Sequence, residues 1–216
     1  MMKFVKRILR YLRKHGKMRL CFGGASIDSI HAWSDSDFAG DDASPKDSHK
    51  STSSFYVFLG HSAIIWKSKL QATVAQSSTE AEFVSASLCS NEIMWLRSVM
   101  RELGFAPSQS TLLFVDNKAC KDSARNPVNY KRLKHINNVR YHSLRERHEN
   151  GDVYVLWIDG DYNLADLGTK FLPRRRFELL RDTVFGLRRF ELPDRKDPYE
   201  RQRLAEILDR VYGSSR

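Results

Sequence analysis

The sequence predicts a single α/β domain built around a mixed β-sheet. Three segments of strand composition come first, and only a short turn separates the second from the third. One long helical pattern follows, and after it short apolar segments alternate with further helical ones. This alternation is typical of parallel strands connected by helices, whereas the early hairpin requires antiparallel neighbours. At 216 residues and 41% hydrophobic, the chain can bury one substantial core.

Five strands are expected, each bounded by turn residues. In the first of them, Trp33 and Asp35 share a face, because side chains alternate along a strand. The second and third strands are joined at Gly60-His61, which indicates a hairpin. The predicted strands cover residues 29–37, 52–60, 62–68, 111–117 and 152–159.

Helical segments are predicted from apolar spacing and from capping residues. The longest is expected to start at Ser77 or Ser78 and to stop at Gly104. Asn163 is the expected cap of a helix that follows the fifth strand. The predicted helices cover residues 3–15, 77–103, 117–124, 131–149 and a segment from 163 onward. After Pro173 an amphipathic stretch gives way to a charged tail.

Two acids two residues apart, Glu80 and Glu82, open the long helix and point to different sides of it. Stepping at helical spacing from Glu82 gives an apolar stripe, whose members are Ala86, Cys89, Ile93, Leu96, Met100 and Leu103. The same steps from Glu80 give a mostly polar face. Glu82 is therefore expected on the buried face, where an ionised carboxylate needs a cation or a donor. It is either an acid at the rim of the core or a metal-binding or catalytic acid.

The formal net charge of +10 is unevenly distributed along the chain. Residues 1–20 hold eight basic and no acidic side chains, whereas residues 21–116 hold six basic and eleven acidic ones. Residues 117–150 hold nine basic and three acidic side chains, and residues 151–170 hold one basic and four acidic. This alternation favours a nuclease, because carboxylates hold cations while basic surfaces hold the polyanion. Ordinary patchiness of a protein surface is the competing explanation.

Other classes of protein are disfavoured by the composition. No apolar run reaches membrane-spanning length and no signal-peptide pattern opens the chain, so neither a membrane protein nor a secreted one is expected. Cys21, Cys89 and Cys120 form neither a metal motif nor a disulfide framework, which indicates a reducing compartment. The arginine-rich, acid-free segment 3–15 is either a basic amphipathic helix or a mitochondrial transit peptide.

Four acids stand where expected strands end or the following helices begin. Asp35 lies at the end of the first strand, and Asp116 lies at the end of the fourth. Glu82 and Asp166 lie in the first turns of the helices predicted from 77 and 163. Each acid alone has an ordinary explanation as a turn residue, a cap or a partner of the helix dipole. Because active sites of α/β sheets gather at the carboxyl ends of strands, the four together predict a divalent-cation site.

Six motifs follow one another along the chain: "WSDSDFAG", "STSSFYVFLG", "IIWKSKLQATVAQSSTEAEFVSAS", "LFVDNKAC", "KHINNVRYHSLRE" and "DYNLADLGTKFLP". Together they resemble the RNase H domain of copia-type long-terminal-repeat retrotransposon polyproteins, over about residues 3–181. The opening "KRILRYLRKHG" is similar to the last helix of the preceding reverse transcriptase, which disfavours a transit peptide. The predicted organisation is a basic helix over 1–20 and an RNase H-like domain over 21–181. A charged C-terminal tail over 182–216 follows, which the resemblance does not cover.

The resemblance implies an RNase H-like fold, with a five-stranded mixed sheet flanked by helices. It also implies endonucleolytic hydrolysis of the RNA strand of RNA–DNA hybrids during reverse transcription, with two Mg²⁺ ions for which Mn²⁺ substitutes. The implied catalytic and metal-binding residues are Asp35, Glu82, Asp116 and Asp166. The implied partners are the hybrid and the polymerase domain of the same polyprotein, without a membrane. The implied location is the cytoplasm, within a virus-like particle, or the nucleus.

Basic residues in and before the fourth predicted helix are candidates for phosphate contacts, although a solvated helix face explains them nearly as well. They are Lys131, Arg132, Lys134, Arg140, Arg145 and Arg147. Lys67 and Lys69, on either side of Ser68 and next to Trp66, are weaker candidates.

The chain also departs from the family pattern. Ser54 stands where glycine is usual, and "KHINNVRYH" is one residue longer than its usual form. The loop before Asp166 lacks the histidine that many cellular RNases H carry there, and the chain has no Tyr-x-Asp-Asp polymerase motif. Two hypotheses from different classes remain open: an active RNase H, and a catalytically silent or co-opted relic that binds RNA or hybrids.

Overall fold

A computed structural model of the chain describes residues 2–22, 29–39, 49–126, 138–188, 190, 205, 206 and 209. Its five strands form one mixed sheet in the order β3-β2-β1-β4-β5. They cover Ile30–Asp37 (β1), Thr52–Leu59 (β2), Ser62–Leu70 (β3), Thr111–Val115 (β4) and Val153–Trp157 (β5). Strands β1, β2 and β3 pair in antiparallel fashion, whereas β4 is parallel to both β1 and β5. The predicted five-stranded mixed sheet of an RNase H-like fold is confirmed.

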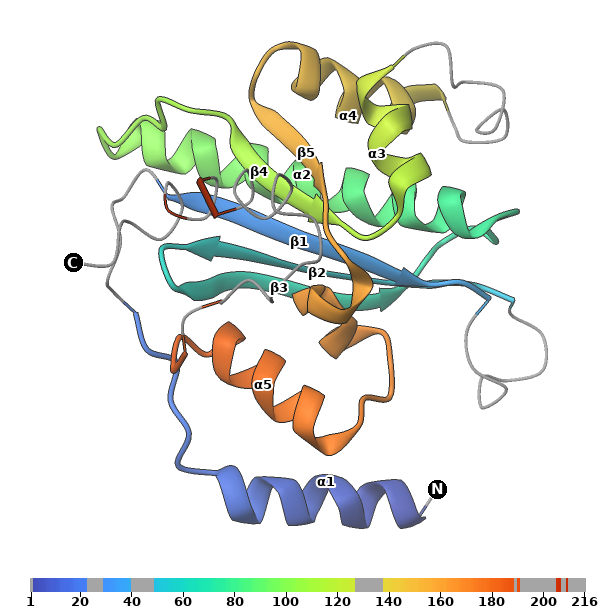
Figure 1. Ribbon diagram of the computed structural model, residues 1–216, viewed down its shortest axis with the longest axis vertical. Coiled ribbons are helices and arrows are strands. Elements are labelled where there is room, and N and C mark those ends of the chain that lie inside the picture. The colour runs from blue at the N-terminus through green and yellow to red at the C-terminus, as the bar shows by residue number, and fades with distance from the viewer. Residues whose placement is uncertain are drawn as a thin grey trace.

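Helices cover both faces of this sheet. Figure 1 shows α2, α3 and α4 on one side and α5 on the other, with α1 outside α5. The helices cover Met2–His15 (α1), Ser78–Glu102 (α2), Lys118–Arg125 (α3), Asn138–Glu149 (α4) and Arg174–Val184 (α5). Two 3₁₀ turns, Gly160–Tyr162 (η2) and Leu164–Gly168 (η3), lie between β5 and α5. Within the described ranges, no helix is both long and apolar enough to cross a membrane.

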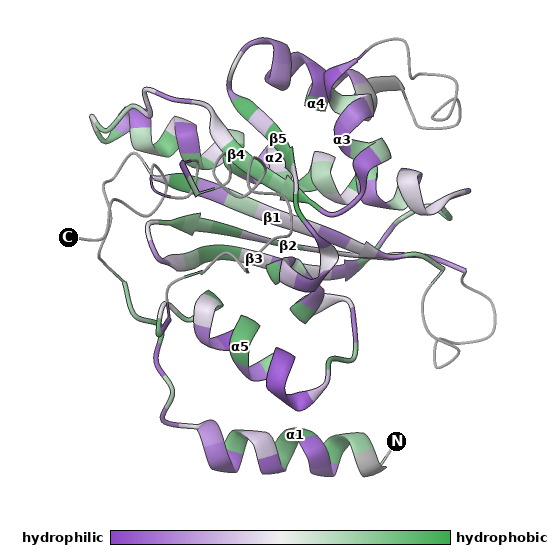
Figure 2. Ribbon diagram, in the orientation of Figure 1, coloured by the Kyte–Doolittle hydropathy of each residue, from purple (hydrophilic) through white to green (hydrophobic). Residues whose placement is uncertain are grey.

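The central strands send alternate side chains into two separate cores. Ala32 packs in the core beneath α2, whereas its neighbour Trp33 packs in the core beneath α5. The same alternation separates Leu113 from Phe114 in β4, so that Trp33 and Phe114 stack with ring centroids 4.4 Å apart. Figure 2 shows that β1 becomes hydrophilic toward its carboxyl end, beyond these apolar pairs. The carboxyl end of β1 is therefore a polar end of a strand whose middle is apolar.

Helix α2 begins where the sequence predicts, because two side chains accept hydrogen bonds from main-chain N–H groups at its start. Ser77 Oγ accepts the N–H of Glu80 at 3.1 Å, and the Glu80 carboxylate accepts the N–H of Gln76 at 2.8 Å. Glu82 is only 6% exposed, which confirms its expected place on the buried face. Leu103, expected at the end of the apolar stripe, is instead 64% exposed, because it is the C-cap beyond the last helical turn.

The helix predicted from residue 163 onward is wrong in its length, since only the 3₁₀ turn η3 forms there. Asn163 does cap this turn, because its side-chain oxygen accepts the N–H of Ala165 at 3.1 Å. The turn ends where Gly168 lies directly against Ser54 of β2. Helix α5 starts only after Pro173, whose fixed φ and missing N–H favour the start of a helix over its continuation.

Helix α1 forms as the basic amphipathic helix that the sequence predicts. Tyr11 packs edge-on against Phe177 of α5, with ring centroids 5.6 Å apart. The apolar side chains on α1 stay 46–60% exposed, and they are Phe4, Val5, Ile8, Leu9 and Leu12. Only part of the apolar surface of this helix is therefore covered.

Replacing Gly168 by alanine is expected to destabilise the fold next to Asp166. A Cβ at this position would overlap the hydroxyl of Ser54 and would lie 2.9 Å from its Cβ and 3.3 Å from the Cβ of Ser68. We expect the free energy of unfolding, measured with urea, to fall by about 1–3 kcal/mol. Adding Ser54→Gly removes the overlapping atoms and should restore most of the loss. An equal loss in the single and the double variant would contradict this explanation.

Candidate metal centre

The parallel register of β1 and β4 brings two of the predicted site residues side by side. Trp33 pairs with Phe114, and Asp35 and Asp116 each follow two residues later. Because side chains alternate along a strand, both carboxylates leave the sheet on the same face. Asp35 is fully buried, and the side chain of Asp116, just beyond β4, is 15% exposed.

Side chains from neighbouring elements hold the backbone beneath these two acids. Ser85 of α2 donates its hydroxyl to the main-chain oxygen of Asp35 at 2.7 Å. Trp157, at the end of β5, donates its indole N–H to the main-chain oxygen of Asp116 at 2.9 Å. Lys118 in turn lies over the Trp157 ring, with its Nζ 4.3 Å from the centroid. The backbone at Asp35 and at Asp116 is thus fixed by side chains from other elements, α2 and β5.

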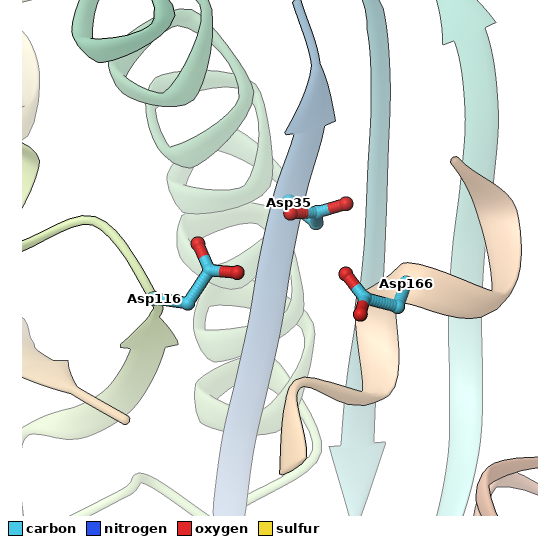
Figure 3. Close-up of side chains that lie close together, drawn as sticks. All are labelled: Asp35, Asp116 and Asp166. Atoms are coloured by element: carbon cyan, nitrogen blue, oxygen red, sulfur yellow. The ribbon is translucent and has the colours of Figure 1, made fainter. Parts of the chain in front are cut away.

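The turn η3 brings Asp166 to the same place. Its capping residue Asn163 donates its side-chain N–H to the main-chain oxygen of Ser34 at 3.0 Å, which ties the turn to β1. Asp166 is 1% exposed. One carboxylate oxygen from each of Asp35, Asp116 and Asp166 lies within 4.8 Å of the others. Figure 3 shows the three side chains converging from β1, β4 and η3.

Glu82 reaches the site from α2 but is not part of this group of three. Its Oε1 accepts the main-chain N–H of Ser36 at 3.1 Å, while its buried Oε2 has no hydrogen-bond partner among the described residues. Burial, and then the nearby charges of Asp35 and Asp116, raise the pKa of Glu82 well above its usual value. An orphaned carboxylate oxygen is costly unless a cation or a proton meets it.

Three donors around the acids were not singled out from the sequence. The ammonium of Lys170 lies 2.6 Å from Asp166 Oδ1, 3.2 Å from Asp35 Oδ1 and 3.9 Å from Asp116 Oδ2. Thr169 donates its hydroxyl to the other oxygen of Asp35. The third donor, Arg176, binds the other oxygen of Asp166 and also donates to the carbonyl of Gly160 at 2.6 Å.

The spacing of Asp166 and Lys170 was the available sequence signal, since residues four apart are neighbours on a helical turn. It predicts at most a contact with Asp166, because the approach to Asp35 and Asp116 depends on the tertiary fold. Arg176 follows two other arginines, and the sequence gives no means of choosing among the three.

The pKa values of the site reflect burial working against the lysine charge. Burial raises the pKa of Asp116, and the charge of Lys170 opposes this rise. Burial and the charge of Asp35 raise the pKa of Asp166, against hydrogen bonds and charges from Lys170 and Arg176. Burial alone would lower the pKa of Lys170, but the three carboxylates outweigh it and raise that pKa instead. The site is therefore an excess of negative charge compensated by cationic side chains.

The residues present fit a divalent metal. Hard cations such as Mg²⁺ and Mn²⁺ take carboxylate oxygens, and three such oxygens already converge within the reach of one coordination site. The unpartnered Oε2 of Glu82 adds a fourth oxygen that gains from a nearby cation. The buried Asp35, Asp116 and Asp166 cluster is thus a candidate metal-binding site.

Comparison with known proteins identifies the family. No family model matches the chain. Over 180 residues it is 39% identical to the retrovirus-related Pol polyprotein from transposon TNT 1-94 of Nicotiana tabacum. Over 174 residues it is 38% identical to that from transposon RE1 of Arabidopsis thaliana. These matches cover 83% and 81% of this chain. The chain belongs to the copia-type Pol polyproteins.

The copia-type chain spans only 13% and 12% of the lengths of these two relatives, and it therefore matches one region of a much longer polyprotein. Among solved structures it resembles LC11-RNase H1, isolated from compost by a metagenomic approach, at 11% identity and a TM-score of 0.42. That match covers 73% of this chain and 96% of the other. The assignment of the RNase H-like sheet is based on the strand order of the chain itself.

The predicted phosphate contacts of this copia-type region are only partly described. Lys131, Arg132 and Lys134 lie outside the described residues, as does the side chain of Arg140. Arg145 pairs with Glu149 of its own helix, at 2.8 Å. The other described candidate, Arg147, donates to Ser90 Oγ at 2.6 Å and to Asn91 Oδ1 at 2.7 Å, which ties α4 to α2. Among the weaker candidates, Lys67 pairs with Glu92 at 3.9 Å and Lys69 is exposed.

Proposed function

We propose that this chain is a metal-dependent ribonuclease H that hydrolyses the RNA strand of RNA–DNA hybrids. The proposed metal ligands and catalytic residues are Asp35, Glu82, Asp116 and Asp166, with two Mg²⁺ ions that Mn²⁺ can replace. The observation that carries the proposal is the convergence of three carboxylates from β1, β4 and η3 beside an unpartnered, buried oxygen of Glu82. Membership of the copia-type Pol polyproteins supports it.

The proposed reaction is hydrolysis of a phosphodiester bond. A water oxygen bonds to phosphorus as the bond from phosphorus to the 3′ oxygen breaks, which leaves a 5′-phosphate and a 3′-hydroxyl. Divalent ions held by these acids would lower the pKa of the attacking water and stabilise the charge on the leaving oxygen. The chain itself holds the backbone that carries the acids before substrate arrives, through hydrogen bonds from Ser85, Asn163 and Trp157 to main-chain oxygens.

The access of substrate follows from the exposure of the acids. Asp116 has the most exposed side chain of the clustered acids, at 15%, against 0% for Asp35 and 2% for Asp166. The scissile phosphate is therefore expected to approach from the side of Asp116. Recognition of a hybrid would depend on its shape and its 2′-hydroxyls, with little readout of sequence. The proposed phosphate contacts remain Lys131, Arg132, Lys134, Arg140, Arg145 and Arg147.

The test is cleavage of an end-labelled RNA–DNA hybrid by the purified chain in Mg²⁺ or Mn²⁺. Single-stranded RNA, double-stranded DNA and a reaction in EDTA serve as controls. We expect cleavage of the RNA strand of the hybrid alone, and only when a metal is present. Equal cleavage of single-stranded RNA, or cleavage in EDTA, would contradict the proposal. Tight binding of the hybrid without cleavage in either metal would favour a catalytically silent relic.

We also propose the polymerase domain of the same polyprotein as a partner, through helix α1. Its sequence resembles the last helix of a reverse transcriptase, and its exposed apolar side chains support contact with a further protein surface. The proposed organisation keeps a basic helix over 1–20, an RNase H-like domain over 21–181 and a tail from 182. Helix α5 runs past this last boundary to Val184.

A further inference from the structure

The side chain of Lys170 occupies the point at which the clustered carboxylates converge. Its ammonium lies between 2.6 and 3.9 Å from one oxygen of each of Asp35, Asp116 and Asp166. These are the three acids whose oxygens lie within 4.8 Å of one another. One tethered cation thus contacts the whole group at once, which a pairwise surface ion pair does not do.

Two of the remaining carboxylate oxygens, those of Asp35 and Asp166, have separate donors. Thr169 holds the second oxygen of Asp35, and Arg176 holds the second oxygen of Asp166. Lys170 contacts the other oxygen of each, Oδ1 of Asp35 and Oδ1 of Asp166. A lysine ammonium offers one positive charge and three donors to these oxygens, whereas a divalent metal offers two charges to the same oxygens.

The Lys170 side chain is also able to leave. It is 38% exposed, whereas the Asp35 and Asp166 side chains that it contacts are 0% and 2% exposed. Lysine carries its charge on a flexible four-carbon stem, so the ammonium can move to solvent without a change of backbone. Thr169 and Arg176 would keep the second carboxylate oxygens of Asp35 and Asp166 in place when the ammonium leaves.

We propose that Lys170 is a built-in substitute for the metal, which holds the carboxylates together in the metal-free protein and is displaced when a divalent cation binds. This inference rests on the proposed function in so far as it takes these acids to be the metal site. Its consequence is competition: every metal ion that binds must first displace an ammonium, so Lys170 lowers metal affinity while it stabilises the empty site. Lys170 is thus a positioning residue for the carboxylates.

The alternative is that Lys170 is a fixed structural partner of Asp166, which stays in place when metal binds. The two explanations predict opposite effects of a neutral side chain. If Lys170 competes, removing its charge raises metal affinity. If it only braces Asp166, removing it lowers metal affinity or leaves it unchanged, because a ligand loses support.

The experiment compares the wild-type chain of 216 residues with Lys170→Met, both freed of metal with EDTA and dialysed. Binding of Mg²⁺ and of Mn²⁺ is titrated by calorimetry, and melting temperature is recorded over the same metal concentrations. Lys121→Met is the matched control, since it removes the same charge from a lysine whose described ion pair is with Asp122. Lys170→Gln, which keeps a neutral donor, serves if the methionine variant does not fold without metal.

We expect Lys170→Met to bind metal about tenfold more tightly than the wild type. Its melting temperature should be below that of the wild type without metal, and the difference should shrink as metal is added, because binding stabilises the folded state by mass action. Lys121→Met should bind metal as the wild type does. Unchanged or weaker binding by Lys170→Met, with a constant difference in melting temperature, would overturn the inference alone. Absence of metal binding in every variant would overturn both this inference and the proposed metal site.

Discussion

Replacing Asp116 by asparagine is expected to lower the rate of hybrid cleavage by more than about a hundredfold. Changing a residue that only supports a metal ligand typically costs 10- to 100-fold, so changing a ligand should cost more. Asparagine keeps the shape of the side chain but loses its charge. The effect should appear in single-turnover cleavage of a labelled hybrid at saturating Mg²⁺.

The stability of the same variant separates chemistry from folding. Burial raises the pKa of Asp116, which means that the folded chain holds this charge less well than the unfolded chain does. In metal-free buffer near neutral pH, Asp116→Asn should therefore unfold at the same or a higher concentration of urea than the wild type. Asp122→Asn is the matched control, because that carboxylate is 51% exposed and pairs with Lys121. Cleavage by Asp116→Asn at the wild-type rate would remove Asp116 from the proposed site.

Acidification is expected to destabilise the chain through His31 of β1. This histidine is fully buried and stacks on Phe58, with ring centroids 4.8 Å apart. Burial lowers the pKa of His31 to about 3, against an opposing hydrogen bond with Ser29. An unfolded histidine has a pKa of about 6.5. Between these two values the unfolded chain binds a proton that the folded chain excludes, so stability falls as the pH falls.

The expected size is about 1.4 kcal/mol of unfolding free energy per pH unit below pH 6.5, or roughly 2–3 kcal/mol at pH 4.5. Guanidinium denaturation at pH 7.0 and pH 4.5 measures the loss for the wild type and for His31→Gln, which does not titrate. The wild type should lose this much more than the variant. His49→Gln, at an exposed position, should behave as the wild type does. Equal losses in the wild type and His31→Gln would contradict the prediction.

Much of the candidate site could be predicted from the sequence. The ends of strands can be recognised where apolar and polar residues stop alternating, and two of the acids lie at such ends. Asp35 and Asp116 each follow an apolar partner by two residues, and parallel pairing of those partners brings the acids together. The buried side of Glu82 followed from the stripe along α2. These predictions need only periodicity and the topology of a mixed sheet.

The cations of the site could not be predicted in the same way, because their contacts depend on tertiary structure. The sequence predicts a helix after Asn163, in which Lys170 would contact Asp166 alone. The chain instead leaves the helical path after Gly168, and this departure carries the ammonium to Asp35 as well. Arg147 is a second example. The sequence shows that it lies on a basic helix, but not that its guanidinium donates hydrogen bonds to Ser90 and Asn91 of another helix.

The order in which the chain leaves the ribosome gives the placement of Lys170 a further consequence. Asp35 and Asp116 are synthesised first, but the cluster of three carboxylates is incomplete until Asp166 emerges. Lys170 emerges four residues after Asp166 and contacts Asp35 across 135 residues of chain. The last acid and its counter-ion thus arrive within one short segment. A newly made chain can close this cluster with a counter-ion already in place, before it has met any metal ion.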